Sequence, residues 1–104
     1  MRKAEVFMSG KSAGILEEIE FGKIYRFIYH DEYDGISVSL TMPVKEKIFE
    51  FERFPPFFDG LLPEGVLLEG LLKQGKIDKY DYFSQLITVG GDLVGAVTVK
   101  EILE

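Results

Sequence analysis

The chain has 104 residues, of which 46% are hydrophobic and 29% are charged, and its formal net charge at pH 7 is −6. This length and composition are typical of one globular domain and exclude disordered and fibrous proteins. The acidic balance argues against direct nucleic-acid binding, which needs a basic surface to replace the counterions around phosphate groups.

Several further classes are excluded by what the sequence lacks. No apolar run approaches the roughly 18 residues that a membrane-spanning helix needs. No apolar segment follows the basic residues after Met1, as it would in a signal peptide. The absence of cysteine excludes a disulfide framework and a cysteine-based zinc site. We therefore expect a cytoplasmic protein that does not associate with membranes.

The N-terminal half has the alternating pattern of β-strands. We predict strands over residues 3–8, 13–16 and 23–30, with a tight hairpin at 9–11 and a polar turn at 17–22. Asp34-Gly35 is a hairpin signal, and the alternating segment 36–42 after it predicts a further strand that ends at Pro43. The charged and aromatic segment 45–54 is expected to be an irregular connection.

The C-terminal half changes to a helical pattern after Pro55. Residues 57–62 predict a single turn, and Pro63 suits the first position of a helix that ends near Gly75. The i,i+4 pairs Leu67/Leu71 and Leu68/Leu72 give this helix an apolar face, and Gly70 within it predicts close backbone packing.

A second helix is predicted from a cap at Asp78 to Gly90-Gly91, and residues 95–99 predict a last strand. Strands, then helices, then a strand indicate an α+β fold in one domain over residues 1–104. We expect a mostly antiparallel sheet of about five strands, with two helices packed in the C-terminal half.

One histidine and three carboxylates lie within five positions, at His30, Asp31, Glu32 and Asp34. Such a group can form a metal site or an acid–base pair, but these residues are also common in hairpin tips. A single His without a second His or Cys is a poor zinc ligand set. We therefore predict a solvated turn, with no metal and no cofactor.

The segment Gly90-Gly91-Asp92-Leu93-Val94-Gly95 is only superficially like a phosphate-binding loop. It leads from a helix into a strand and lacks the Gly-Lys-Ser/Thr ending, whereas a phosphate loop precedes a helix N-terminus. We predict a structural turn formed by Gly90, Gly91, Asp92 and Gly95, in which the Asp92 carboxylate accepts hydrogen bonds from loop amides. Kinase signatures and a Gly-x-Ser-x-Gly elbow are absent, so no catalytic residue is expected and the protein is predicted not to be an enzyme.

The twelve residues from Phe54 to Gly65 contain three Pro, three Phe and two Leu. Such a segment is either a stiff connection that closes one end of the core or an exposed apolar surface that binds a protein partner. Composition does not separate the two interpretations. We call residues 57–65 the ridge, and its candidate partner-binding residues are Phe57, Phe58, Asp59, Leu61, Leu62, Pro63, Glu64 and Gly65.

Three segments occur in the order seen in a known family: Ser39-Leu40-Thr41-Met42-Pro43, residues 56–65, and residues 91–97. They resemble the N-terminal domain of HipA-type serine/threonine kinases, which are toxins of bacterial toxin–antitoxin systems. The Phe-Phe-Asp-Gly-Leu-Leu-Pro-Glu-Gly run is specific, and the resemblance covers essentially the whole chain. A full HipA continues into a second subdomain and the kinase proper, so the resemblance implies that this chain carries no catalytic residue.

The chain on its own is similar to HipS of the HipBST arrangement, in which the shortened kinase HipT is the toxin. The resemblance implies an antitoxin that docks on a HipA/HipT-family kinase and inhibits it, with a DNA-binding HipB protein in the same complex. A second hypothesis is a structural subdomain that completes or assembles a kinase complex without inhibiting it. A third is a small enzyme that uses His30 and its neighbouring carboxylates.

Overall fold

A computed structural model describes residues 1–93 and 95–103. The elements in chain order are β1 (Arg2–Met8), β2 (Lys11–Glu20), β3 (Ile24–Tyr29), a 3-10 turn (Val44–Glu46), β4 (Ile48–Phe51), α1 (Pro56–Asp59), α2 (Gly65–Gly75), α3 (Tyr82–Val89) and β5 (Val97–Ile102).

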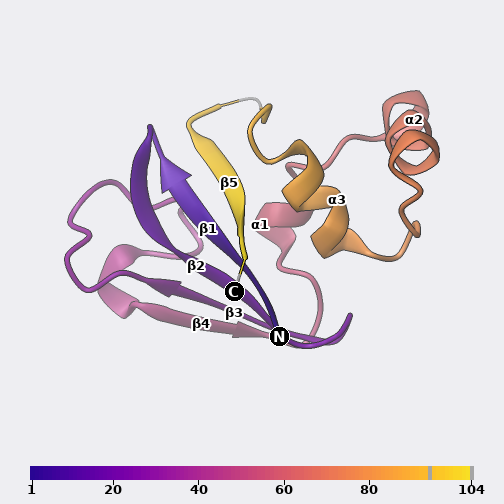
Figure 1. The fold of residues 1–104 in the computed structure, drawn as a ribbon. Coiled ribbons are helices and arrows are strands. Elements are labelled where there is room, and N and C mark those ends of the chain that lie inside the picture. The colour runs from indigo at the N-terminus through magenta and orange to yellow at the C-terminus, as the bar shows by residue number, and fades with distance from the viewer. Residues whose placement is uncertain (94, 104) are drawn as a thin grey trace.

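The strands form a five-stranded sheet in the order β4-β3-β2-β1-β5, and every neighbouring pair is antiparallel. Figure 1 shows α1 and α3 beside the sheet and α2 beyond them, at the edge of the molecule. The prediction of an α+β fold with a mostly antiparallel sheet is confirmed.

One face of the sheet carries the core, because alternate residues of its strands are buried against α1 and α3. Phe58 of α1 and Phe83 and Leu86 of α3 belong to the same buried cluster as the inward-facing strand residues. The strand members of that cluster are Ala4, Val6, Ala13, Leu16, Tyr25, Phe27, Tyr29, Val97 and Val99.

The predicted polar turn at 17–22 is wrong, since β2 continues through Glu17 and Glu18 to Glu20. Both carboxylates are buried within the strand because each has a cationic partner. Glu17 pairs with Arg26 at 2.9 Å, and Glu18 pairs with Arg2 at 2.6 Å. Charge compensation from neighbouring strands therefore allows a sequence that looks like a turn to lie inside the sheet.

The predicted strand over 36–42 is also wrong. This segment is a loop in which Ser39 and Met42 form an isolated bridge. The Tyr29 hydroxyl holds the loop on the core by donating to the Met42 carbonyl at 2.5 Å and accepting from the Val38 N–H at 3.0 Å. Val38 and Met42 are buried, whereas Leu40 is fully exposed, so the apolar residues do not share one face.

Segment 45–54 is not wholly irregular, because residues 48–51 form the edge strand β4 against β3. Phe49 and Phe51 alternate with the exposed residues Ile48 and Glu50 and pack against the core. The short length of the strand and the flanking charged residues hide this alternation in the sequence.

The helices differ from the predictions at their boundaries. Helix α2 begins at Gly65, two residues after Pro63. Helix α3 is capped by the Asp81 carboxylate, which accepts from the Ser84 N–H at 3.1 Å, while Asp78 caps the preceding turn through the Tyr80 N–H. Close packing at Gly70 is not observed, because a Cβ added there meets no heavy atom within 4 Å.

Arg2 fixes the start of α3 to the sheet. Its guanidinium donates to Glu18 at 2.6 and 2.9 Å, to Asp81 at 2.9 Å and to the Ser84 hydroxyl at 2.8 Å. The cation also lies over the Phe83 ring, 4.9 Å from its centroid. This network joins β1, β2 and α3 and so positions the C-terminal helical region.

Among the described residues no helix is long and apolar enough to cross a membrane.

Candidate interaction surface

The ridge is divided between the core and the surface. Phe58 is fully buried, and its ring lies 5.9 Å from that of Phe27 and 5.1 Å from that of Phe57. Phe58 therefore closes the core and is not accessible to a partner in this structure. Of the candidate residues it is the one that the structure places inside the molecule.

The remaining ridge residues reach the surface. Asp59, Glu64 and Gly65 are exposed, whereas Phe57, Leu61, Leu62 and Pro63 are half-buried. The structure therefore places Phe58 in the core and leaves the other candidate residues at the surface. A role of the outward residues in partner binding stays a prediction.

A hollow of about 430 Å³ lies beside the ridge, and we call it the ridge hollow. It is lined by Gly60, Leu61, Leu62, Pro63, Leu67, Val89, Asp92 and Leu93. The ridge thus meets the start of α2 and the end of α3 with its following turn. The structure brings together the ridge and the turn after α3, which are distant in the sequence, and it adds Leu67, Val89 and Leu93, which were not predicted as site residues.

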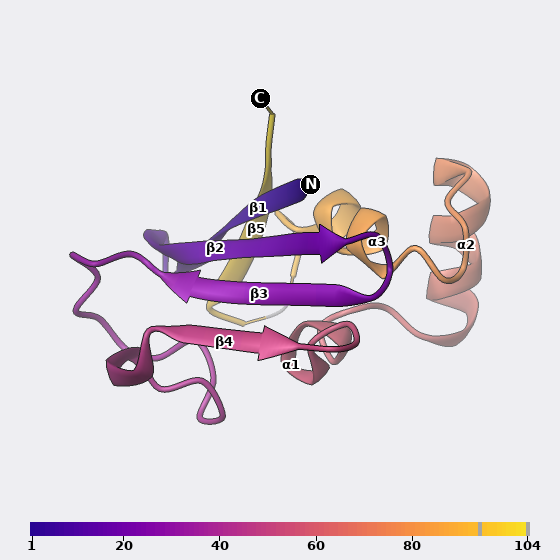
Figure 2. The ribbon, with the colours of Figure 1, turned by 90° about the horizontal axis from the view of Figure 1, so that it is seen from below.

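Helix α2 is the element least integrated into the core. None of its residues is buried, and Val66 and Leu67 are 82% and 76% exposed. Figure 2 shows the helix standing apart from the sheet, with α3 between them. An apolar helix that its own chain leaves uncovered is a feature of protein interaction surfaces. The i,i+4 pairs of leucines in α2, which include Leu67, were the feature of the sequence that could have indicated Leu67 as a site residue.

The turn after α3 depends on close contact between Gly90 and β5. The Val99 N–H donates to the Gly90 carbonyl at 2.9 Å, and a Cβ added to Gly90 would lie 2.1 Å from the Val99 oxygen. Gly91 has open space around it, and Gly95 has a φ of +106°.

The Asp92 carboxylate lines the ridge hollow but forms no hydrogen bond with another described residue. Its backbone N–H donates to the Val89 carbonyl at 2.8 Å. Val94, in the same predicted turn, lies outside the described residues.

His30 and its neighbouring carboxylates do not converge. His30 Nε2 lies 3.0 Å from Ser12 Oγ on β2 and 3.9 Å from Glu5 Oε2 on β1. Asp34 instead pairs with Lys11 at 3.0 Å, and the Lys11 ammonium lowers the pKa of that carboxyl. Within residues 1–93 and 95–103, no group of three His, Asp or Glu side chains is arranged to hold a metal ion.

Comparisons with known proteins extend over nearly the whole chain. A sequence model of the family described as HipA N-terminal domain matches residues 4–100. An uncharacterized protein of Haemophilus influenzae is 34% identical over 101 residues, which cover 97% of this chain and 93% of that protein. A solved structure described as the N-terminal domain of HipA toxin superposes with a TM-score of 0.78 and 29% identity, covering 100% of this chain and 95% of the other.

This chain also matches one part of a longer relative. The "Putative kinase Y4dM" of Sinorhizobium fredii is 33% identical over 104 residues, which cover 91% of this chain but 25% of that protein. The resemblance noted from the ridge and the two other segments is therefore confirmed at the level of the family. The chain belongs to the HipA N-terminal domain family.

Proposed function

We propose that this chain is a non-catalytic, HipS-like antitoxin domain that binds a HipA/HipT-family serine/threonine kinase and inhibits it. The surface that binds the kinase comprises the outward ridge residues, the ridge hollow and the start of α2. The observation that carries the proposal is the exposure of α2, an 11-residue helix with no buried residue beside an apolar hollow. Membership of the HipA N-terminal family supports a kinase as the partner.

The chemistry of the surface suits protein docking. Leu61, Leu62 and Leu67 line the hollow together with Val89 and Leu93. Fully burying one leucine side chain is worth about 1.5–3 kcal/mol, so covering the exposed Leu67 and the remaining surface of Leu61 and Leu62 contributes to docking and offsets part of the cost of association. A kinase complex can also contain a HipB-like DNA-binding protein, which this chain would meet through the kinase.

The binding experiment compares two Leu→Asp variants of the free domain. Leu67→Asp places a charge in the ridge hollow, whereas Leu40→Asp makes the same change at a fully exposed position of the loop before β4. By titration calorimetry with a purified HipA-family kinase, Leu67→Asp should weaken binding at least tenfold and Leu40→Asp less than threefold. Equal affinities for the two folded variants would move the kinase-binding surface elsewhere.

A second candidate function is a structural subdomain that completes a kinase without inhibiting it. The match to about a quarter of a protein named as a kinase favours this alternative. Kinase activity separates the two functions, because the antitoxin lowers it on binding and the structural subdomain leaves it unchanged or raises it.

A further inference from the structure

The two edges of the sheet differ in how they are protected. At the β5 edge, the N–H of Val99 points outward and donates to the Gly90 carbonyl at 2.9 Å. The residue after α3 therefore blocks the middle of that strand. The other edge is β4, which pairs with β3 and with no second strand among residues 1–93 and 95–103. Native proteins usually block or cover such edges, because the free N–H and C=O groups are a template for another strand.

The register identifies the free backbone groups of β4. The Tyr29 N–H donates to the Lys47 carbonyl, which makes this a hydrogen-bonded pair of the antiparallel ladder. Pairs alternate along such a ladder, so Phe49 and Phe51 also bond to β3, opposite Phe27 and Tyr25. The N–H and C=O groups of Ile48 and Glu50 therefore point away from the sheet, and none of them bonds to another described residue.

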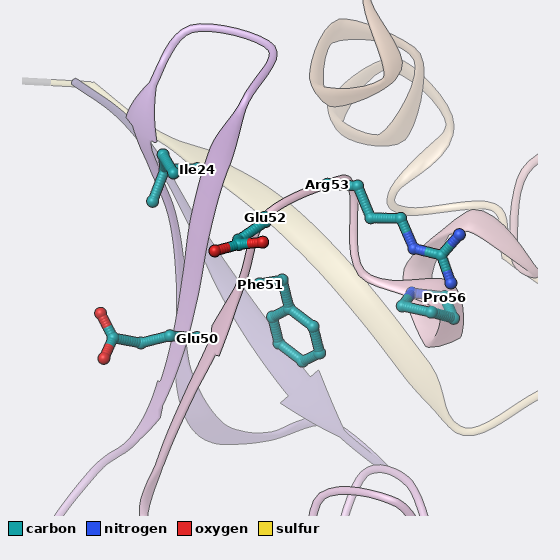
Figure 3. Close-up of a pocket in the computed structure, with 6 residues that line it drawn as sticks. All are labelled: Ile24, Glu50, Phe51, Glu52, Arg53 and Pro56. Carbon is teal, nitrogen blue, oxygen red and sulfur yellow. The ribbon is translucent and has the colours of Figure 1, made fainter.

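A groove made of two hollows follows this free edge. One hollow of about 410 Å³ is lined by Thr41, Met42, Ile48, Phe49, Glu50, Phe51, Pro56 and Phe57. A second of about 870 Å³ is lined by Ile24, Glu50, Phe51, Glu52, Arg53 and Pro56 (Figure 3). The two hollows share Glu50, Phe51 and Pro56, so they adjoin along the strand. The first hollow is mainly apolar, and the second is lined by the charged residues Glu50, Glu52 and Arg53 as well as by Phe51 and Pro56. An edge strand beside a groove is the arrangement by which proteins capture an extended peptide.

The charged residues along the β4 edge favour one kind of bound segment. Glu50 and Phe51 point to opposite sides of β4 (Figure 3), so an added strand would place one set of side chains beside Glu50 and the alternate set in the groove. Glu50 and Glu52 form no ion pair with any described residue, and Arg26, which lies opposite Glu50 on β3, pairs with Glu17 instead. Arg53 is the one cation among the described residues that line the second hollow, against two carboxylates. Together with the chain's net charge of −6, they favour a basic occupant over a second copy of this acidic chain.

We propose that the β4 edge is a strand-addition site for an extended segment of a partner protein in which apolar residues alternate with Lys or Arg. The apolar side chains lie in the groove over Phe49 and Phe51, and the basic side chains lie beside Glu50 and Glu52. The backbone of the segment bonds to Ile48 and Glu50. This site is separate from the ridge hollow, and it does not depend on the proposed kinase inhibition.

The test uses a labelled hexapeptide of alternating lysine and valine, with the alternating glutamate and valine hexapeptide as its control. Fluorescence anisotropy with the full chain should show at least tenfold tighter binding of the lysine peptide. Amide exchange of Ile48 and Glu50, followed by NMR, should slow when the lysine peptide is added. Absence of binding at millimolar peptide, equal binding of both peptides, or unchanged exchange at these two amides would overturn the proposal.

Three substitutions at Glu50 distinguish the contribution of backbone hydrogen bonds to peptide binding from the contribution of charge. Glu50→Pro removes an N–H that points outward and does not bond to β3. Proline is tolerated at such positions of edge strands. The substitution should weaken binding of the lysine peptide at least tenfold. Glu50→Ala should reduce the preference for the lysine peptide, since Glu52 remains, and Glu50→Lys should reduce it further. Unchanged affinity in a folded Glu50→Pro variant would refute strand addition.

Sedimentation velocity of the free chain tests the competing occupant. The proposal expects a monomer for both the wild type and Glu50→Pro. A wild-type dimer that Glu50→Pro dissociates would assign the edge to a second copy and overturn the proposal. Because no kinase is present in these experiments, their failure is distinguishable from a failure of the antitoxin proposal.

Discussion

Replacing Arg2 by methionine should destabilise the fold strongly, because Arg2 is the cationic partner of a buried carboxylate. The side chain of Glu18 is 2% exposed and takes two hydrogen bonds from Arg2, at 2.6 and 2.9 Å. Removing one partner of a buried pair costs about 3–5 kcal/mol. Glu18 keeps bonds from the Gly22 N–H at 3.1 Å and the Tyr25 hydroxyl at 3.2 Å, so we expect the lower end, about 3 kcal/mol.

Urea unfolding followed by circular dichroism measures this loss, and the melting temperature should fall by about 12 °C or more. Arg26→Met is the matched control, since Arg26 makes one bond to Glu17, which is also buried but keeps Lys3 as a second cationic partner at 3.5 Å. We expect the control to cost about 1 kcal/mol. In a double-mutant cycle, Arg2→Met and Glu18→Gln should couple by at least about 1 kcal/mol. A loss below about 1 kcal/mol for Arg2→Met would refute the reasoning.

Three further predictions concern the glycines and the acid stability. Gly90→Ala should lower the free energy of unfolding by more than about 2 kcal/mol, because its Cβ would overlap the Val99 oxygen. The control Gly91→Ala should change it by less than about 0.5 kcal/mol. Equal melting temperatures for the two variants would contradict this prediction. Gly70→Ala should stabilise the chain by about 0.5–1 kcal/mol in urea, since nothing surrounds that position, and destabilisation would reveal a packing contact. Burial alone would raise the pKa of Asp81, but bonds from Arg2 and Ser84 outweigh it and lower the pKa below its ordinary value. The unfolded chain then binds this proton more readily, so stability is retained above about pH 4 and lost as the pH falls further. Asp81→Asn should flatten this acid limb of the stability curve, and an equally steep limb would contradict the assignment.

The sheet was predictable where alternation and turn chemistry agree. The hairpin between β1 and β2 is an example, since Ser9 and Gly10 both adopt positive φ there, at 51° and 82°. Alternation failed at 36–42, where Val38 and Met42 are buried by contacts with Tyr29 from another part of the chain. Local sequence does not contain that tertiary information, and the same limit hid β4, which forms because β3 offers it a partner.

The candidate surface was predictable only in part. The ridge stands out by its Pro and Phe content, but the burial of Phe58 depends on Phe27 of the sheet. The alignment of the ridge with Leu67 and Leu93 is likewise a product of tertiary packing. Short-range spacing placed His30 with Asp31 and Glu32, whereas strand register places it beside Ser12.

The most direct test of the antitoxin proposal is the phosphorylation activity of a purified HipA-family kinase titrated with this chain. The proposal predicts that activity falls to background at one equivalent of the wild-type domain. Leu40→Asp should inhibit equally well, and Leu67→Asp should need at least tenfold more protein. A stable complex that retains full kinase activity would contradict inhibition and leave a structural subunit as the function.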